Sequence, residues 1–351
     1  MRFRALACAA LLLVALPLLA EPAAPDAPVA TPLEHRRTPD QTFLTFPEWY
    51  LVHSPAEYAT YLGSGAPPSA FPLFAHIGQF WQSYRAVSRE IEKYPFNGGY
   101  HLMVMVIGVS TTVEYGLKGI YEHTVGRLAE AMKFGASPVP EERFAAAYTQ
   151  SYVDFIRIDP WYLYDFWSQL KALWKEAPMR GPDLLRRWER RFLLSSELLA
   201  KEGYAQLIKL GSQSIYDAPK PVTAVLLSKP PAAGAAHADC AQPPAPAATS
   251  GMLAMLPRYE AFTGCSRWLA QQGVDFREIA GNRGEVVVSL LVPDGWAEVE
   301  GASRTLFTQP ILTRTPMQRV VLATPVAQLS NLLRQVEARH GAAAIEHVYD
   351  F

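Results

Sequence analysis

A stretch rich in proline and alanine, residues 229–250, separates two parts of this chain that carry different residue patterns. Such a composition cannot bury enough apolar surface to fold alone, so it marks a domain boundary or a long loop. A length of 351 residues leaves room for two domains of ordinary size. We therefore expect a mainly α-helical domain at 41–216 and a small α+β domain at 217–351 that contains the stretch.

The expected helical domain is rich in aromatic side chains, since most of the chain's 8 Trp, 16 Tyr and 16 Phe residues lie in it. Pro140 followed by two glutamates predicts a helix start, because acidic groups stabilise the first turn. Asp159-Pro160 predicts a helix that runs toward Lys175. Gly181-Pro182-Asp183 predicts another, which should bend or break near Gly203.

The second part contains short runs typical of strands, at Val222–Leu227 and Glu285–Val292, with a further hairpin at Thr305–Thr313 and Arg319–Thr324. Helices are expected at Met252–Gln271 and Val326–Arg339, and a last strand at Ala344–Phe351. This order of elements is compatible with a ferredoxin-like α+β sandwich. That fold hosts many unrelated functions, so it says little about activity.

Residues 1–20 have the pattern of a secretory signal peptide: basic residues first, then an apolar run from Ala5 to Ala20. The run is about 16 residues long, shorter than the roughly 20 that span a bilayer. We expect an exported, periplasmic protein, or one attached to the membrane through an uncleaved N-terminus. Residues 21–40 are rich in proline and alanine and are expected to form a flexible leader.

After removal of a signal peptide, Cys240 and Cys265 are the remaining cysteines. One disulfide bond is compatible with an oxidising compartment, and two thiols without clustered histidines give no zinc signature. We therefore predict no metal site. The formal net charge of -1 produces no overall field that would attract nucleic acid.

Polar groups around an apolar run at 102–109 are the first candidates for chemistry. Glu114, Lys118 and Glu122 lie on one face of a helix, so a surface ladder of i,i+4 ion pairs is the simpler interpretation. The alternative is a polar pocket between helices, with Glu114 or Glu122 and His101 or His76 as catalytic residues. Asp154 is a further catalytic candidate, although an ion pair with Arg157, three residues later, is simpler.

A basic cluster, Arg186, Arg187, Arg190 and Arg191, surrounds Trp188. It is either a solvated helix face or a surface for anionic headgroups with the tryptophan at the membrane interface. The candidate ligand-binding residues are Trp188, Arg187, Arg190 and Tyr100.

Four segments resemble a family of uncharacterised exported or membrane-associated bacterial proteins. They are Phe46-Pro47-Glu48-Trp49-Tyr50, Tyr94-Pro95-Phe96-Asn97-Gly98-Gly99-Tyr100-His101, Val113-Glu114-Tyr115-Gly116-Leu117-Lys118-Gly119 and Arg187-Trp188-Glu189-Arg190-Arg191. The resemblance covers roughly residues 40–216. It implies export but no activity and no catalytic residue.

Two functional hypotheses follow. The first is an envelope protein that binds a lipid, a glycan or a protein, in peripheral contact with the membrane. The second is an enzyme of unknown reaction, with a polar pocket between helices. The sequence contains no nucleophile elbow, phosphate-binding loop or dinucleotide fingerprint. A haem carrier is a minor third hypothesis, because aromatic helical bundles with histidines can hold haem.

Overall fold

The computed structural model describes residues 29–350 except for short gaps at 42, 44, 136, 178–180, 213–221, 233–236, 239, 241–244, 247–250, 297–300, 302 and 340–342. The predicted signal peptide at 1–20 lies outside the described residues. So do the first part of the predicted leader and most of the proline- and alanine-rich stretch.

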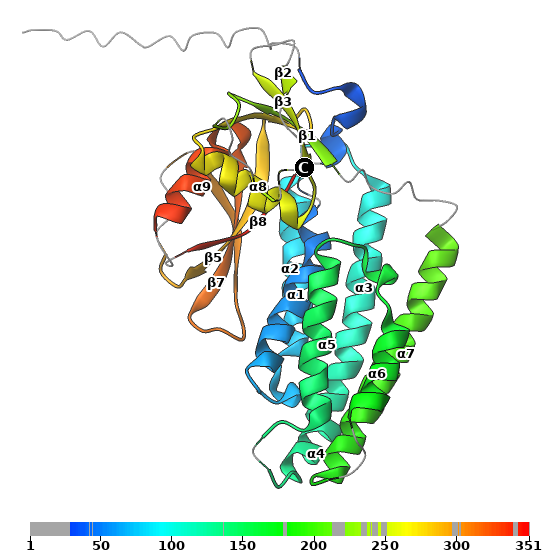
Figure 1. Ribbon diagram of the computed structural model, residues 1–351. Coiled ribbons are helices and arrows are strands. Elements are labelled where there is room, and N and C mark those ends of the chain that lie inside the picture. Colours follow the sequence, from blue (N-terminus) through cyan, green and yellow to red (C-terminus); the bar gives the residue numbers. More distant parts are fainter. Residues whose placement is uncertain are drawn as a thin grey trace, which may run out of the picture.

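The first part of the chain is helical, as predicted, up to about residue 210 (Figure 1). Its α-helices are α1 (Thr45–Gly63), α2 (Leu73–Glu90), α3 (Gly98–Tyr121), α4 (Arg127–Ala131), α5 (Pro140–Ile156), α6 (Phe166–Glu176) and α7 (Leu184–Ser212). The π-helical turn η4 (Glu122–Gly126) joins α3 to α4. Short 3-10 turns are η1 (Leu33–His35), η2 (Pro39–Gln41), η3 (Pro68–Ala70) and η5 (Trp161–Leu163).

Two helix predictions needed correction. The residues after Asp159-Pro160 form only η5, and α6 begins later because the Asp165 side chain caps it by accepting a hydrogen bond from the Ser168 N–H at 2.9 Å. Helix α7 continues through Gly203 without a break, since the helix hydrogen bonds tolerate an exposed glycine at modest cost. The predicted start of α5 at Pro140 is confirmed.

The second part forms two four-stranded antiparallel sheets with two helices. The strands are β1 (Val222–Leu227), β2 (Ala245–Pro246), β3 (Met252–Pro257), β4 (Phe276–Ile279), β5 (Glu285–Pro293), β6 (Arg304–Pro310), β7 (Met317–Pro325) and β8 (Ala344–Val348). The helices are α8 (Glu260–Gln271) and α9 (Leu329–Ala338), the latter preceded by the 3-10 turn η6 (Val326–Gln328). The predicted helix at 252–271 is wrong in its first third, where β3 lies, and β4 was not predicted.

The two sheets repeat one connectivity. Their strand orders are β2-β3-β1-β4 and β6-β7-β5-β8, with α8 before β4 and α9 before β8. Strand β1 pairs antiparallel with β3 and β4, and β5 pairs in the same way with β7 and β8. In each unit the helix therefore links two parallel strands that lie on either side of a central strand. Strands β3 and β7 even end alike, with Pro257 opposite Val222 and Pro325 opposite Glu285. The ferredoxin-like expectation is thus supported only in part: the split β-α-β unit is present, but the strands form two sheets rather than one.

The sheet β6-β7-β5-β8 is buried on both faces. Along β5, Val286, Val288 and Leu290 point into a core shared with α8 and α9. Val287 points the other way, into a core formed with Phe46 of α1 and its neighbours. This second core joins the sheet to α1 and α2, and in Figure 1 the sheet lies beside these helices with α8 and α9 on its far side.

Part of the segment that was expected to be a flexible leader is bound to the α+β region. The backbone N–H groups of Ala30 and Thr31 donate to the buried Glu278 carboxylate of β4 at 3.1 Å, and the Thr31 hydroxyl donates at 2.9 Å. Arg37 N–H donates to Ala280 O at 2.7 Å. These hydrogen bonds hold residues 30–37 in place, which composition alone did not reveal.

Candidate functional site

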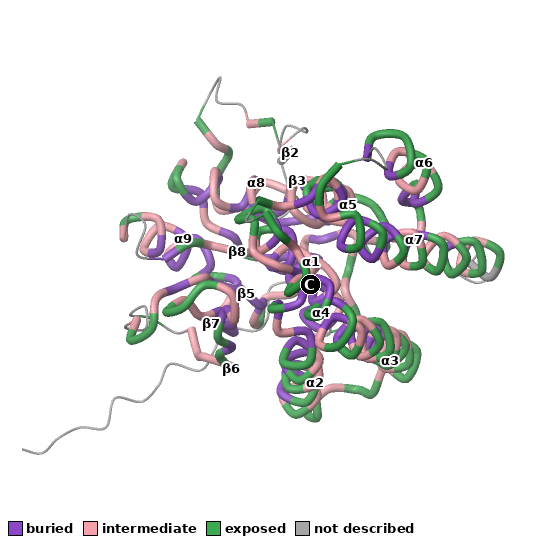
Figure 2. The backbone as a smooth tube through the Cα atoms, turned by 90° about the horizontal axis from the view of Figure 1, so that it is seen from below, coloured by how far each residue is buried: buried purple, intermediate pink, exposed green. Residues whose placement is uncertain are grey.

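Large apolar side chains are exposed along the outer sides of helices α3, α4 and α7, whose exposed residues Figure 2 colours green. We call this surface the α3–α7 apolar face. Its members on α3, η4 and α4 are Leu102, Met105, Val106, Val109, Val113, Leu117, Ile120, Val125, Leu128 and Met132. Its members on α7 are Leu184, Leu185, Trp188, Phe192, Leu199, Tyr204, Leu207 and Leu210. With each side chain roughly half exposed, the set presents on the order of 1,000 Å² of apolar surface, more than the largest patch of a typical monomer.

The arginines of α7 point into the protein instead of into solvent. Arg186, Arg187, Arg190 and Arg191 are 1–4% exposed, whereas Trp188 between them is 52% exposed. Both sequence interpretations of this cluster assumed an exposed basic surface, and the structure corrects that assumption. An isolated guanidinium is too costly to bury, so each must find an anionic partner inside the protein.

Glutamates from three helices and η4 supply these partners. Arg190 makes a bidentate pair with Glu122, at 2.7 and 3.0 Å, and Arg186 bonds Glu142 at 2.8 Å. Both Arg187 and Arg191 contact Glu141 of α5. The cluster therefore leaves the exposed side of α7 without charge, and among the described residues of 184–210 none of those classed as exposed is Asp, Glu, Lys or Arg.

A second group of ion pairs joins α3 to α7. Lys118 lies 2.9 Å from Glu197, and Lys201 lies 3.1 Å from Glu114 and 3.3 Å from Glu197. The predicted ladder along α3 is therefore wrong, since these side chains pair across to α7 and Glu122 pairs with Arg190. Burial would raise the pKa of Glu197, but the two ammonium groups outweigh it and lower that pKa to about 2.

The π-helical turn after α3 brings Glu122 into the arginine cluster. Glu122 is 1% exposed, and a Cβ at Gly126 would lie 2.4 Å from its Oε2 atom. A larger residue at this position would displace the carboxylate, so the glycine leaves room for it beside Arg190. π-turns often occur at functional sites, but here the turn orients a charged partner for Arg190.

A buried polar network lies at the junction of the two regions. Arg319 of β7 is 1% exposed and donates to Glu346 of β8 at 2.6 and 2.7 Å and to Glu57 of α1 at 3.2 Å. His53 of α1 lies 3.4 Å from Glu346 and 3.1 Å from the Tyr349 hydroxyl. The network thus fixes α1 against β7 and β8 by directional contacts within an otherwise apolar interface.

Burial sets the protonation of this network. It raises the pKa of Glu57 to about 7, because the nearby Arg319 only partly offsets the loss of hydration and Glu346 adds repulsion. It lowers the pKa of His53 to about 4 and that of His76 to about 3. For Glu346, burial acts to raise the pKa, but Arg319 and His53 lower it to about 2. Glu346 is therefore charged and both histidines are neutral at pH 7.

Within this network, Ser54, His76 and Glu57 stand in the order of a nucleophile, a base and an acid. The Ser54 hydroxyl lies 3.0 Å from His76 Nδ1, and His76 Nε2 lies 3.6 Å from Glu57 Oε2. However, Ser54 is 2% exposed and also bonds the Tyr115 hydroxyl at 2.9 Å. A nucleophile must be reached by its substrate, and this serine lies inside a packed helix interface. His53 and His76 are packed, hydrogen-bonded residues of this interface.

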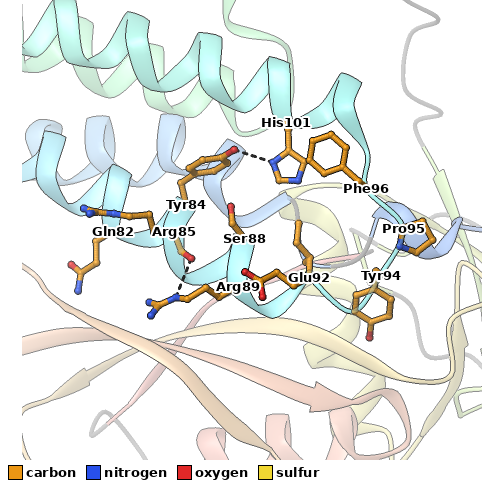
Figure 3. A pocket seen from close by; sticks show the side chains of 11 residues that line it. Gln82, Tyr84, Arg85, Ser88, Arg89, Glu92, Tyr94, Pro95, Phe96 and His101 are labelled. Atoms are coloured by element: carbon orange, nitrogen blue, oxygen red, sulfur yellow. Dashed lines mark hydrogen bonds between the residues drawn. The ribbon is translucent and has the colours of Figure 1, made fainter.

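An open cavity of about 900 Å³ lies beside the start of α3 (Figure 3). His101 lines it, with Nδ1 2.9 Å from the Tyr84 hydroxyl and its ring stacked on Phe96 at 4.7 Å between centroids. Partial burial lowers the pKa of His101. Arg85 and Arg89 of α2 form another wall of the cavity.

The catalytic candidates are not brought together. His101 and Glu114 are 13 residues apart on one helix, about 20 Å along its axis. Asp154 lies on the exposed side of α5 and accepts a hydrogen bond from Gln150 at 2.9 Å. No ion pair between Asp154 and Arg157 is found in the described part of the chain. Tyr100, a ligand candidate, donates to Glu48 at 2.8 Å.

Sequence reasoning missed Glu57, Arg319 and Glu346. The available signal was Arg319 itself, a charged residue within a predicted strand, but nothing in a strand pattern names its partners. Cys240 and Cys265 form a disulfide bond, which the sequence left open. Within the described residues, no helix is long and apolar enough to cross a membrane, and no cluster of three or more His, Cys, Asp or Glu side chains could hold a metal ion.

Comparison with known protein families, with characterised proteins and with solved structures finds no match to this chain. The resemblance to exported bacterial proteins stays a prediction.

Proposed function

We propose that this is an exported envelope protein whose helical region docks onto a lipid bilayer through the α3–α7 apolar face. The observation that carries the proposal is the row of exposed apolar side chains along α3, α4 and α7, together with the burial of the four α7 arginines in ion pairs. In water this arrangement leaves a large apolar area hydrated, which is unfavourable. Contact with the hydrocarbon of a bilayer would remove this unfavourable free energy of hydration.

The chemistry of the face favours acyl chains over a protein partner. A specific protein interface carries about one hydrogen bond per 100–200 Å², whereas the exposed groups of α7 are almost all apolar. Its four arginines are already paired internally, so they offer a partner nothing to match. Helices α3 and α7 are about 36 Å and 44 Å long. These lengths suit helices that lie along a membrane surface rather than across it.

Other features support the location. The sequence predicts export, and the disulfide bond between Cys240 and Cys265 fits an oxidising compartment. Trp167 and Trp174 of α6 are half exposed, and tryptophan favours membrane interfaces. In this proposal the α+β region is the part that docks a partner. Its two split β-α-β units each resemble part of a ferredoxin-like fold. The enzyme hypothesis is less well supported, because its candidate residues lie apart.

The test uses vesicles of phosphatidylcholine with brominated acyl chains, which quench tryptophans that enter the hydrocarbon. We expect quenching of the processed full-length protein, and a smaller effect in W188F because Trp188 belongs to the face. V109E/F192E should partition roughly a hundredfold more weakly, since two apolar side chains lose their transfer free energy.

The control variant is A147E, which adds a charge on the outer side of α5 and should bind like the natural protein. All variants should keep their helical circular dichroism. Equal quenching and partitioning of V109E/F192E and the natural protein would refute the proposal. A dimer that V109E/F192E converts to a monomer, with no vesicle binding by either, would refute it in favour of self-association.

A further inference from the structure

The cavity beside α3 contains groups suited to an anion. Arg85 and Arg89 are exposed and one helical turn apart on α2, and their Nε atoms donate only to carbonyls of their own helix, at 3.1 and 3.4 Å. Within the described residues no ion pair joins either arginine to a carboxylate, although Glu92 also lines the cavity. Their terminal nitrogens are therefore available to a ligand.

A hydroxyl in the same cavity also lacks a partner. The Ser88 Oγ atom is buried and, among the described residues, has no hydrogen-bond partner, although buried hydroxyls are nearly always paired. Ser88 lies between Arg85 and Arg89 in sequence and lines the same cavity, as Figure 3 illustrates. Two guanidinium groups and a hydroxyl donor form a set typical of phosphate recognition.

The position of the cavity connects it to the apolar face. His101 in its wall is followed directly by Leu102, and Met105 lies one turn further along α3. Both of these residues are exposed members of the face. Phe96, stacked on His101, is 79% exposed and adds an aromatic surface at the rim. An amphiphile with its polar end in the cavity would therefore have its chains at the start of the face.

We propose that this cavity binds the phosphate-bearing headgroup of an anionic lipid, with Arg85, Arg89 and Ser88 as its ligands and with the acyl chains over Leu102 and Met105. The inference rests on the proposed bilayer docking and adds a preference for one lipid class. His101, bonded to Tyr84, shapes one wall of the site.

The experiment compares partitioning of the processed full-length protein onto phosphatidylcholine vesicles with and without phosphatidylglycerol. Each basic residue near an anionic surface contributes enough for roughly a fivefold effect, so we expect a preference of about twentyfold for the anionic vesicles. R85Q/R89Q should lose this preference and keep its binding to pure phosphatidylcholine. R314Q/K229Q removes two exposed charges from the α+β region and should behave like the natural protein.

These outcomes separate the two proposals. Loss of binding to both vesicle types in V109E/F192E concerns the apolar face, whereas R85Q/R89Q concerns only the cavity. An unchanged phosphatidylglycerol preference in R85Q/R89Q would overturn the headgroup site. So would binding of soluble glycerol phosphate by the natural protein with no preference between vesicles, because the cavity would then serve a soluble phosphate ester.

Discussion

The helical region and the α+β region place their large apolar side chains in different ways. In the α+β region, no large apolar side chain among the described residues of 222–350 is exposed, and Val286, Val288 and Leu290 are fully buried. In the helical region, exposed leucines, valines and tryptophans follow α3 and α7 for most of their length. One chain thus combines a region of ordinary globular type with a region that carries a large apolar surface.

The two regions also differ in where their charged side chains lie. Away from the buried Arg319–Glu346 pair at the junction, the α+β region has surface pairs such as Arg334 with Asp275, each of which is worth little. The helical region buries four arginines of α7 with glutamates of α5 and η4, which costs desolvation that only close pairing offsets. Buried pairs of this kind are expected where the outer side of a helix must be free of charge.

The largest effect is expected at the network that joins the regions. Arg319→Leu leaves Glu57 and Glu346 buried without their cation, which should lower the free energy of unfolding by about 3–5 kcal/mol. Arg314→Leu, on the exposed hairpin between β6 and β7, should change it by less than about 0.5 kcal/mol. Urea unfolding followed by circular dichroism measures both, and similar losses would show that the network does not hold the regions together.

A matched pair of leucines tests the contrast in burial directly. Leu290→Ala in β5 removes a fully buried side chain and should cost about 3 kcal/mol. Leu117→Ala on the apolar face removes one that is 66% exposed and should cost less than about 0.5 kcal/mol in detergent-free solution. Thermal unfolding is the measurement. A loss of stability at Leu117 as large as that at Leu290 would mean that the face is covered in solution.

The raised pKa of Glu57 predicts a pH dependence. Because the pKa is about 7 in the folded protein and 4.5 by default, the folded state binds more protons between these values, and this group's contribution to stability falls as the pH rises through them. Glu57→Gln removes this pH dependence. The free energy of unfolding of the variant minus that of the natural protein should therefore increase by on the order of 2–3 kcal/mol between about pH 5 and about pH 8. Chemical denaturation at several pH values measures this, and a constant difference would contradict it.

The smallest effect is expected at Glu114. This residue is 41% exposed on its side chain and pairs with Lys201 at 3.1 Å, so Glu114→Ala should cost less than about 1 kcal/mol. Glu122→Ala, which removes one of the two carboxylates that pair with the buried Arg190, should cost several times more. If the two variants unfold at the same temperature, the distinction drawn between exposed and buried pairs does not hold.

Much of the fold could be predicted from local patterns. Pro140 with its two acids marked the start of α5, and the β-branched run at 222–227 marked β1, because propensities and capping act over a few residues. Strand β3 was mistaken for the start of a helix, since Met, Leu and Ala favour helices and only pairing with β1 makes them a strand. The division of the strands into two sheets also depends on pairing between distant segments.

The candidate site was predicted less well. Trp188 is exposed, whereas its neighbours Arg187 and Arg190, which were expected at the surface beside it, lie inside. A helical pattern shows that two sets of residues lie on opposite faces without showing which face is buried. In the first half of α7 the usual rule, apolar inside, assigns the faces the wrong way round, although Leu194 and Leu198 further along the helix are buried as the rule expects. The partners that reverse it, Glu122 and Glu141, lie far away in sequence.

By itself, the sequence determined the helical and α+β character of the two parts and the separation of charged from apolar faces on α7, because these depend on neighbours within a few residues. The tertiary structure alone decided that the arginines are buried, that α1 and β7 share Arg319, and that a cavity lies beside His101. The physical reason is that burial and ion pairing depend on which distant segments approach, and a pattern of residue types is compatible with many such approaches.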